Sequence, residues 1–130
     1  GVSIDLSLRG ACTRGTGMRG GSENIRVRSI SGRFRDRSRG YWFGNEGEPE
    51  LYGASADWME RNLMRRIEIG VPILEPDLAK RVYDETLDNY LRDNTQAWAL
   101  GADGRHTRCE PATGELPHSA QQALLAHYST

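Results

Sequence analysis

Cysteine and long apolar runs are scarce in this sequence. Its two cysteines, Cys12 and Cys109, are too few and too far apart for a disulfide framework or a zinc site, which favours a reducing compartment. No apolar run approaches the roughly 18 residues of a membrane span, and no segment resembles a signal peptide. We therefore expect a cytoplasmic protein without a membrane span. The absent initiator methionine leaves targeting open, and membrane association also stays open.

Histidine and tryptophan are also rare. The three histidines are His106, His118 and His127. None has a carboxylate or cysteine at metal-ligand spacing, so we expect surface histidines and no metal bound by this chain. The three tryptophans are Trp42, Trp58 and Trp98. They could stack on nucleic-acid bases, but aromatic residues beside aliphatic ones on strands more often belong to the core, and that is our expectation.

Lysine is nearly missing as well, and arginine takes its place. Sixteen of the seventeen basic residues are arginine, with Lys80 the exception. Residues 1–39 carry a net charge of +6, whereas residues 40–130 carry −7. A high genomic GC content would explain arginine over lysine, but not this clustering. Because the planar guanidinium group grips phosphate or carboxylate with two hydrogen bonds, the basic part is predicted to hold an anion site.

The densest part of the basic region is the stretch GRFRDRSRG at 32–40. It places arginine at every second position, namely at Arg33, Arg35, Arg37 and Arg39. If the stretch is extended, the four guanidinium groups line one face at intervals of roughly 6.5 to 7 Å. Like charges at this spacing repel each other unless water, carboxylates or a polyanion screens them.

Alternating apolar residues and turn residues predict several strands. The predicted strands cover 2–8, 23–30 and 65–73, with a hairpin formed by 40–43 and 51–55. The first strand would deliver Arg9 to its end, where a charged side chain is well placed to line a site. A glycine-rich loop over 10–21 follows and would let backbone N–H groups approach an anion. It lacks the Gly-Lys-Ser/Thr ending of a Walker loop.

Helices are predicted mainly in the second half. A short helical turn at 55–63 is opened by Ser55 or Asp57, and Pro76 opens a helix that runs to about Asn94. Residues 119–128 begin with the capping box Ser119 and Gln122 and form a final helix. At 130 residues the chain suits one α/β or α+β domain with a modest core.

Several motifs, in order and in register, resemble one known family. They are IDLSLRGAC, SENIRVRSI, RSR before a strand, GASADWMERN, RRIEI followed by proline, PDLAKRVYDETLDNYLRDNT and SAQQALL. Together they resemble the C-terminal catalytic domain of bacterial polyphosphate kinases of the first type, from about Val2 to Ala126. The resemblance implies a phospholipase-D-like α/β fold, a mixed β-sheet flanked by helices. It also implies that 1–130 is a single domain and a fragment of that domain in a larger, multidomain enzyme.

For function, the resemblance implies reversible transfer of the terminal phosphate of ATP to inorganic polyphosphate. ATP and ADP would be substrates, and Mg²⁺ would be required, with its ligands outside this chain. The phosphate tunnel lies between domains in that family, and the phosphorylated histidine belongs to the preceding domain. The isolated chain is therefore expected to be inactive. Its expected partners are the remaining domains of the full-length enzyme, which is expected to form a homo-oligomer.

Three arginines match functional positions of the family. Arg9 and Arg66 resemble residues that hold the nucleotide's phosphates, and we expect them to share one crevice. Arg37 stands where an EHSR-like element of the family carries its second histidine, because the letters here are DRSR. Arginine can stabilise negative charge but cannot exchange a proton near neutral pH. The alternative to an enzyme is therefore a degenerate, non-catalytic module that binds polyphosphate or RNA.

Overall fold

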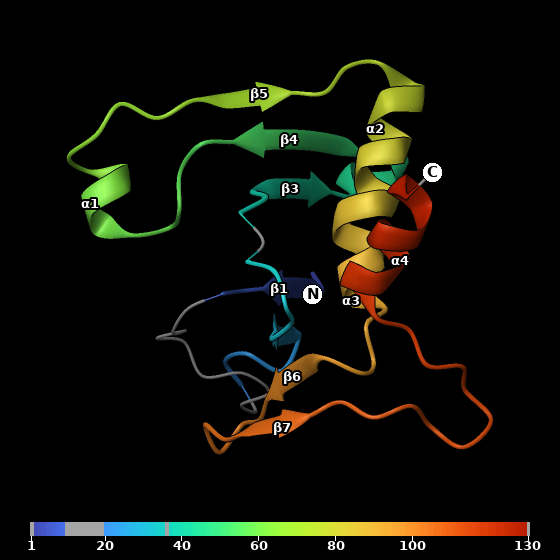
Figure 1. Cartoon of the computed structure of the whole chain (residues 1–130). Helices are drawn as coiled ribbons and strands as arrows, with labels where there is room; N and C mark the ends of the chain where they lie inside the picture. Colours follow the sequence, from blue (N-terminus) through green and yellow to red (C-terminus); the bar gives the residue numbers. More distant parts are fainter. Residues whose placement is uncertain (1, 10–19, 36, 130) are drawn as a thin grey trace. The chain divides into compact units, whose positions relative to one another are not determined.

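The computed structural model describes residues 2–9, 20–35 and 37–129 (Figure 1). Contacts within the chain divide it into two compact units, Gly1–Asp36 with Asn89–Thr130, and Arg37–Asp88. This division does not test the expectation of a single domain, which stays a prediction. None of the helices in the described ranges has both the length and the apolar character needed to cross a membrane.

The first unit is built on a four-stranded mixed sheet of order β1-β2-β6-β7. Its elements are β1 (Ile4–Ser7), β2 (Ile25–Ile30), β6 (Ala97–Leu100), β7 (His106–Arg108) and the helices α3 (Asn89–Leu91) and α4 (Ala120–Tyr128). β1 and β2 pair in parallel, and the other pairs are antiparallel. The strands predicted at 2–8 and 23–30 are confirmed. The hairpin of β6 and β7 was not predicted, although Asp103 and Gly104 supply its turn, with Gly104 at a φ of +79°.

Asp93 organises the polar interior of this unit. Its side chain is 1% exposed, and its carboxylate accepts hydrogen bonds from the backbone N–H groups of Thr95, Gln96 and Ala120 at 3.0, 2.7 and 2.8 Å. Ala120 is the first residue of α4, so Asp93 satisfies a donor that a helix terminus leaves open. Ser119 is the N-cap residue as predicted, but the capping box does not form, because the Ser119 hydroxyl donates to Gln96 instead.

The Asp93→Ala variant is expected to lose about 2–5 kcal/mol of unfolding free energy. The change leaves three backbone donors without their charged acceptor in a site that excludes water. Urea unfolding of the chain, followed by circular dichroism, measures the loss. Glu110→Gln is the matched control, because Glu110 is exposed in the same unit. Equal stability of the two variants would contradict the role given to Asp93.

The second unit carries an antiparallel sheet of order β3-β4-β5. Its elements are β3 (Gly40–Phe43), the 3-10 turn η1 (Asn45–Gly47), β4 (Glu50–Ala54), α1 (Glu60–Leu63), β5 (Gly70–Pro72), α2 (Pro76–Val82) and the π-helical turn η2 (Tyr83–Asp88). The predicted hairpin of β3 and β4 is confirmed. Its turn places Asn45, Glu46 and Gly47 at positive φ, which turns the chain tightly. With both units containing sheet and helix, the predicted α/β class is confirmed, and the strands are divided between two sheets.

The arginine row is not a strand. Within the described residues, β3 begins only at Gly40, and the chain bends at Arg33 and Phe34. The Arg33 guanidinium carbon lies 5.4 Å from the centre of the Phe34 ring. The prediction of one extended face of arginines is therefore wrong. At the bend, the backbone N–H and carbonyl of Phe34 are hydrogen-bonded to the Gln121 side chain of α4 at 3.0 and 2.7 Å.

Two further expectations for the second unit are corrected. α1 begins at Glu60 with Met59 as its N-cap, so neither Ser55 nor Asp57 opens it. The strand predicted over 65–73 is reduced to β5, and Ile67 is 99% exposed. The apolar alternation of this segment thus does not correspond to a buried face.

The tryptophans and one histidine also differ from expectation. Trp42, Trp58 and Trp98 are 45%, 77% and 36% exposed, so the core prediction is wrong for this chain. His118 is half-buried, and its Nε2 atom lies 2.7 Å from the side-chain oxygen of Asn89, so it is not a surface histidine. His106 and His127 are exposed as predicted.

The helix expected from Pro76 to Asn94 is helical to Leu91 and includes the π-helical turn.

Candidate functional site

One end of the second sheet gathers the segments that carry Arg37 and Arg66. β3 begins, β4 ends and β5 begins there, since Gly40 pairs with Gly53 and Ala54 pairs with Gly70. Figure 1 shows α1 at the same end, on the connection that leads from β4 to β5. Arg37 lies just before β3, and Arg66 lies between α1 and β5. We call this region, with Arg37, Arg39, Arg65 and Arg66, the arginine end.

Arg37 and Arg66 are exposed at the arginine end. Within the described part of the chain, neither makes a hydrogen bond or an ion pair. A guanidinium group has five N–H donors in a planar fork, which suits phosphate oxygens. These two side chains are therefore available to an anionic ligand, and the hairpin topology brings their segments to the same end of the sheet.

Arg39 is used differently from Arg37. Its Nε atom donates to Asp57 Oδ1 at 2.8 Å, and its Nη2 atom donates to Asp57 Oδ2 at 3.2 Å. This hydrogen-bonded ion pair with Asp57 raises the pKa of Arg39, to which Glu68 adds a smaller attraction. Glu68 itself accepts a hydrogen bond from the Ser55 hydroxyl. Arg39 is thus committed to a carboxylate of its own chain.

Arg9 belongs to the first unit, two residues beyond the end of β1. The neighbouring Leu8 N–H donates to the carbonyl of Arg28 at 2.9 Å, so the chain follows β2 past the strand's end. Arg9 is exposed. Because Arg9 and Arg66 lie in different units, their shared crevice stays a prediction.

Several other arginines serve the first unit itself. Arg26 pairs with Asp5 at 2.7 Å, and Arg28 donates to the backbone carbonyls of Leu91 and Asp93. Arg108 donates from Nε and Nη2 to the carbonyl of Thr95. These arginines therefore stabilise the first unit, and their contacts do not require an anionic ligand.

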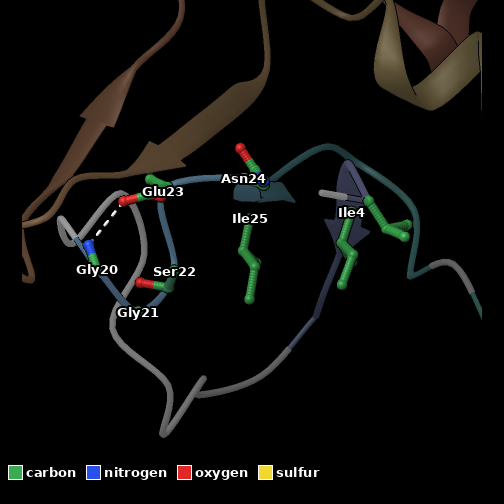
Figure 2. Close-up of a pocket in the computed structure, with 8 residues that line it drawn as sticks. Ile4, Gly20, Gly21, Ser22, Glu23, Asn24 and Ile25 are labelled. Carbon is green, nitrogen blue, oxygen red and sulfur yellow. Dashed lines mark hydrogen bonds between the residues drawn. The ribbon is translucent and has the colours of Figure 1, made fainter.

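A pocket of about 380 Å³ lies on the first unit beside β1 and β2. It is lined by Val2, Ile4, Gly20, Gly21, Ser22, Glu23, Asn24 and Ile25. Figure 2 shows the Ile4 and Ile25 side chains extending to the same side and the Gly20 N–H directed at Glu23, with a hydrogen bond of 2.6 Å. Among the described residues that line the pocket none is basic, and Glu23 would repel an anion. The predicted glycine-rich loop falls mostly on 10–19, outside the described residues.

The described ranges contain no group of three or more histidine, cysteine, aspartate or glutamate side chains that could hold a metal ion. Cys109 is a free thiol.

These features define an α/β chain with a cationic sheet end. Residues 1–121 match the family model described as polyphosphate kinase C-terminal domain 2, and the chain belongs to that family. The match bears out the resemblance found in the sequence motifs.

Relatives and a solved structure agree with this assignment. The chain is 62% identical over 125 residues to a polyphosphate kinase of Xylella fastidiosa and 50% identical over 125 residues to one of Pseudomonas aeruginosa. Each match covers 96% of this chain, which spans only 18% of the length of each relative. A crystal structure of polyphosphate kinase from Porphyromonas gingivalis is similar with a TM-score of 0.90 and 36% identity, over 98% of this chain and 19% of that one.

Proposed function

We propose that this chain is the part of a polyphosphate kinase that binds the phosphates during transfer of the terminal phosphate of ATP to polyphosphate. Arg37 and Arg66 at the arginine end, together with Arg9, would bind phosphate oxygens of ATP and polyphosphate. The observation that supports this most is that exposed Arg37 and Arg66 have no carboxylate partner among the described residues, in a member of this family. The remaining domains of a cytoplasmic homo-oligomer would supply the rest of the site.

Phosphoryl transfer suits a site made of arginines. Its transition state spreads negative charge over the transferred group, and catalysis is mostly positioning and electrostatic stabilisation. Arg37 and Arg66 would hold the oxygens in place and offset that charge. Mg²⁺ would neutralise further charge, but the described residues offer no cluster to hold it, so its ligands are proposed to lie in other domains.

A non-catalytic polyanion-binding module is the second candidate. The motif resemblance favours it, because it sets Arg37 at the position of a family histidine, and arginine cannot act as a general acid or base near neutral pH. Such a module would bind polyphosphate or RNA without turning ATP over. An upstream domain with the phosphorylated histidine in the same gene would support the enzyme, whereas a stand-alone gene would support the module.

Polyphosphate binding by the 130-residue chain is expected to weaken steeply with salt. The Debye length falls from about 30 Å at 0.01 M to about 8 Å at 0.15 M salt, which screens exposed guanidinium groups. Arg66→Ala is expected to weaken binding at low salt by roughly 10- to 100-fold, as for the loss of a charge-assisted hydrogen bond. Titration with fluorescent polyphosphate at several salt concentrations measures both effects.

Arg105→Ala is the matched control, because its side chain is 88% exposed in the first unit, outside the arginine end. Equal weakening by Arg66→Ala and Arg105→Ala would mean that binding follows overall charge and not the arginine end. Salt-independent binding would contradict the electrostatic site. Competition by RNA at equal charge concentration, without ATP turnover by the full-length protein, would favour the module.

A further inference from the structure

The Arg39–Asp57 ion pair joins the two segments that carry Arg37 and Arg66. Arg39 lies two residues after Arg37, and its carbonyl accepts a hydrogen bond of 2.9 Å from the Ala54 N–H at the end of β4. Its guanidinium group makes the two-point contact with Asp57 described above. The segment before β3 is thereby fixed at both its backbone and its side chain.

Asp57 extends this connection to α1. Its carbonyl accepts hydrogen bonds from the Met59 N–H at 2.8 Å and from the Asn62 side-chain nitrogen at 3.2 Å. Asn62 is 5% exposed and lies in α1, which leads to Arg65 and Arg66. The contacts thus run from Arg39 through Asp57 and Asn62 to the helix that precedes Arg66.

Neighbouring contacts keep the pair in place. The Tyr41 ring lies 5.9 Å from the Trp58 ring, centre to centre, and the Tyr41 hydroxyl donates to the carbonyl of Ala56 at 3.5 Å. The Ser55 N–H also donates to the carbonyl of Ile69 at 2.9 Å, which ties the residue before β5 to the end of β4. The pair therefore sits at the junction of the segments that form the arginine end.

We propose that Arg39 and Asp57 are positioning residues, whose ion pair holds Arg37 and Arg66 in place so that both can contact one polyphosphate or nucleotide phosphate group. This inference rests on the proposed function. Neither residue of the pair touches the phosphate. The pair also cancels the Asp57 charge, which would otherwise repel an anion beside the two free arginines.

A structural role alone is a weak explanation of this pair. Its side chains are 28% and 38% exposed, and ion pairs that water reaches contribute little to stability. A positioning role can nevertheless be large, because a displacement of about 1 Å in a catalytic arrangement can cost about 100-fold in rate. Breaking the pair should therefore lower turnover strongly and change the stability of the fold only slightly.

The test is a double-mutant cycle in the full-length enzyme, with kcat and KM measured for ATP and polyphosphate. Arg39→Ala, Asp57→Ala and the double variant are each expected to lower kcat/KM by about 10- to 100-fold, with no further loss in the double variant. Arg39→Lys keeps the charge but not the planar fork, so it should also be impaired. The thermal unfolding midpoint should stay within a few degrees of the wild type.

Simple electrostatics gives a different pattern. If only charge matters, Arg39→Ala weakens phosphate binding while Asp57→Ala strengthens it, and Arg39→Lys is neutral. Opposite effects of the two single variants, additive losses, or unchanged kcat/KM would each overturn the positioning role. If the alanine variants do not fold, Arg39→Lys and Asp57→Asn replace them, and normal kcat/KM in both would overturn the role equally.

Controls separate this inference from the proposed function. Arg81 and Glu85 form an ion pair of 2.8 Å in the same unit, away from the arginine end, and Arg81→Ala should leave kcat/KM unchanged. If Arg66→Ala lowers turnover but the Arg39 and Asp57 variants do not, only the positioning role fails. If Arg66→Ala has no effect either, the proposed phosphate site itself is wrong.

Discussion

Replacing Arg66 by alanine in the full-length enzyme is expected to lower kcat for polyphosphate synthesis by about 10²- to 10³-fold, the range for loss of one donor to a developing anion. The side chain is exposed and has no partner within the described residues, so the change would remove the proposed phosphate contact without breaking an internal one. Arg66→Lys keeps the charge but offers no planar fork, and should recover only part of the rate. Steady-state assays at saturating ATP measure both variants.

If Arg66→Ala unfolds like the wild type, its loss of kcat comes from the missing guanidinium group and not from a less stable fold. Arg105→Ala serves again as the control, because it removes an exposed arginine from the first unit. A rise in KM with unchanged kcat would mean that Arg66 binds the ground state and the transition state equally well. Full activity of Arg66→Ala would remove this residue from the site.

Much of the sheet structure could be predicted from local patterns. β1 follows strict alternation, β2 alternates as far as Arg28, and the β3–β4 hairpin is marked by the turn residues between Phe43 and Glu50. That hairpin is also enough to bring the segment of Arg37 beside the end of β4. The approach of Arg66 to the same end needs the pairing of β5 with β4, which a segment of only three strand residues barely signals.

The ion pair of the arginine end could not be predicted in the same way. Arginine at every second position of 32–40 suggested an extended row, whereas Arg39 pairs with a carboxylate 18 residues away. A partner at that distance depends on how β4 and α1 return to the start of β3. In the sequence, Asp57 was only a candidate to open the helical turn at 55–63, within the motif GASADWMERN, and its pairing with Arg39 was not predicted.

The prediction of which side chains are buried was wrong for a similar reason. Trp58 was predicted in the core and 65–73 as a strand, yet Trp58 and Ile67 are 77% and 99% exposed, near a three-stranded sheet and a helix of four residues. Such small elements offer too little apolar surface to cover them. Conversely, Asp93 and Gln121 are charged or polar but buried, because backbone donors and acceptors from distant segments satisfy them.

If the reaction needs a titratable imidazole at position 37, Arg37→His is expected to raise the turnover of the full-length enzyme near neutral pH. Histidine can exchange a proton there, whereas the guanidinium group of arginine stays charged, and a positioned acid or base typically contributes about 10²- to 10⁴-fold. Arg37 is exposed just before β3 and has no partner in the described part of the chain, so the smaller ring can be placed without breaking an internal contact. The rate at saturating ATP, measured from pH 5.5 to about 8.5, should acquire a dependence centred on the ordinary imidazole pKa of about 6.5.

Arg37→Ala distinguishes the two roles that this position can play. If an imidazole supplies proton transfer, Arg37→His should gain turnover and its pH dependence, while Arg37→Ala should gain neither. If Arg37 itself clamps phosphate, both variants should lose turnover and bind polyphosphate more weakly at low salt, because each removes a permanent positive charge. Unchanged or reduced turnover in Arg37→His at every pH would therefore reject a catalytic deficit at this position, and reduced turnover in both variants would assign Arg37 to phosphate binding.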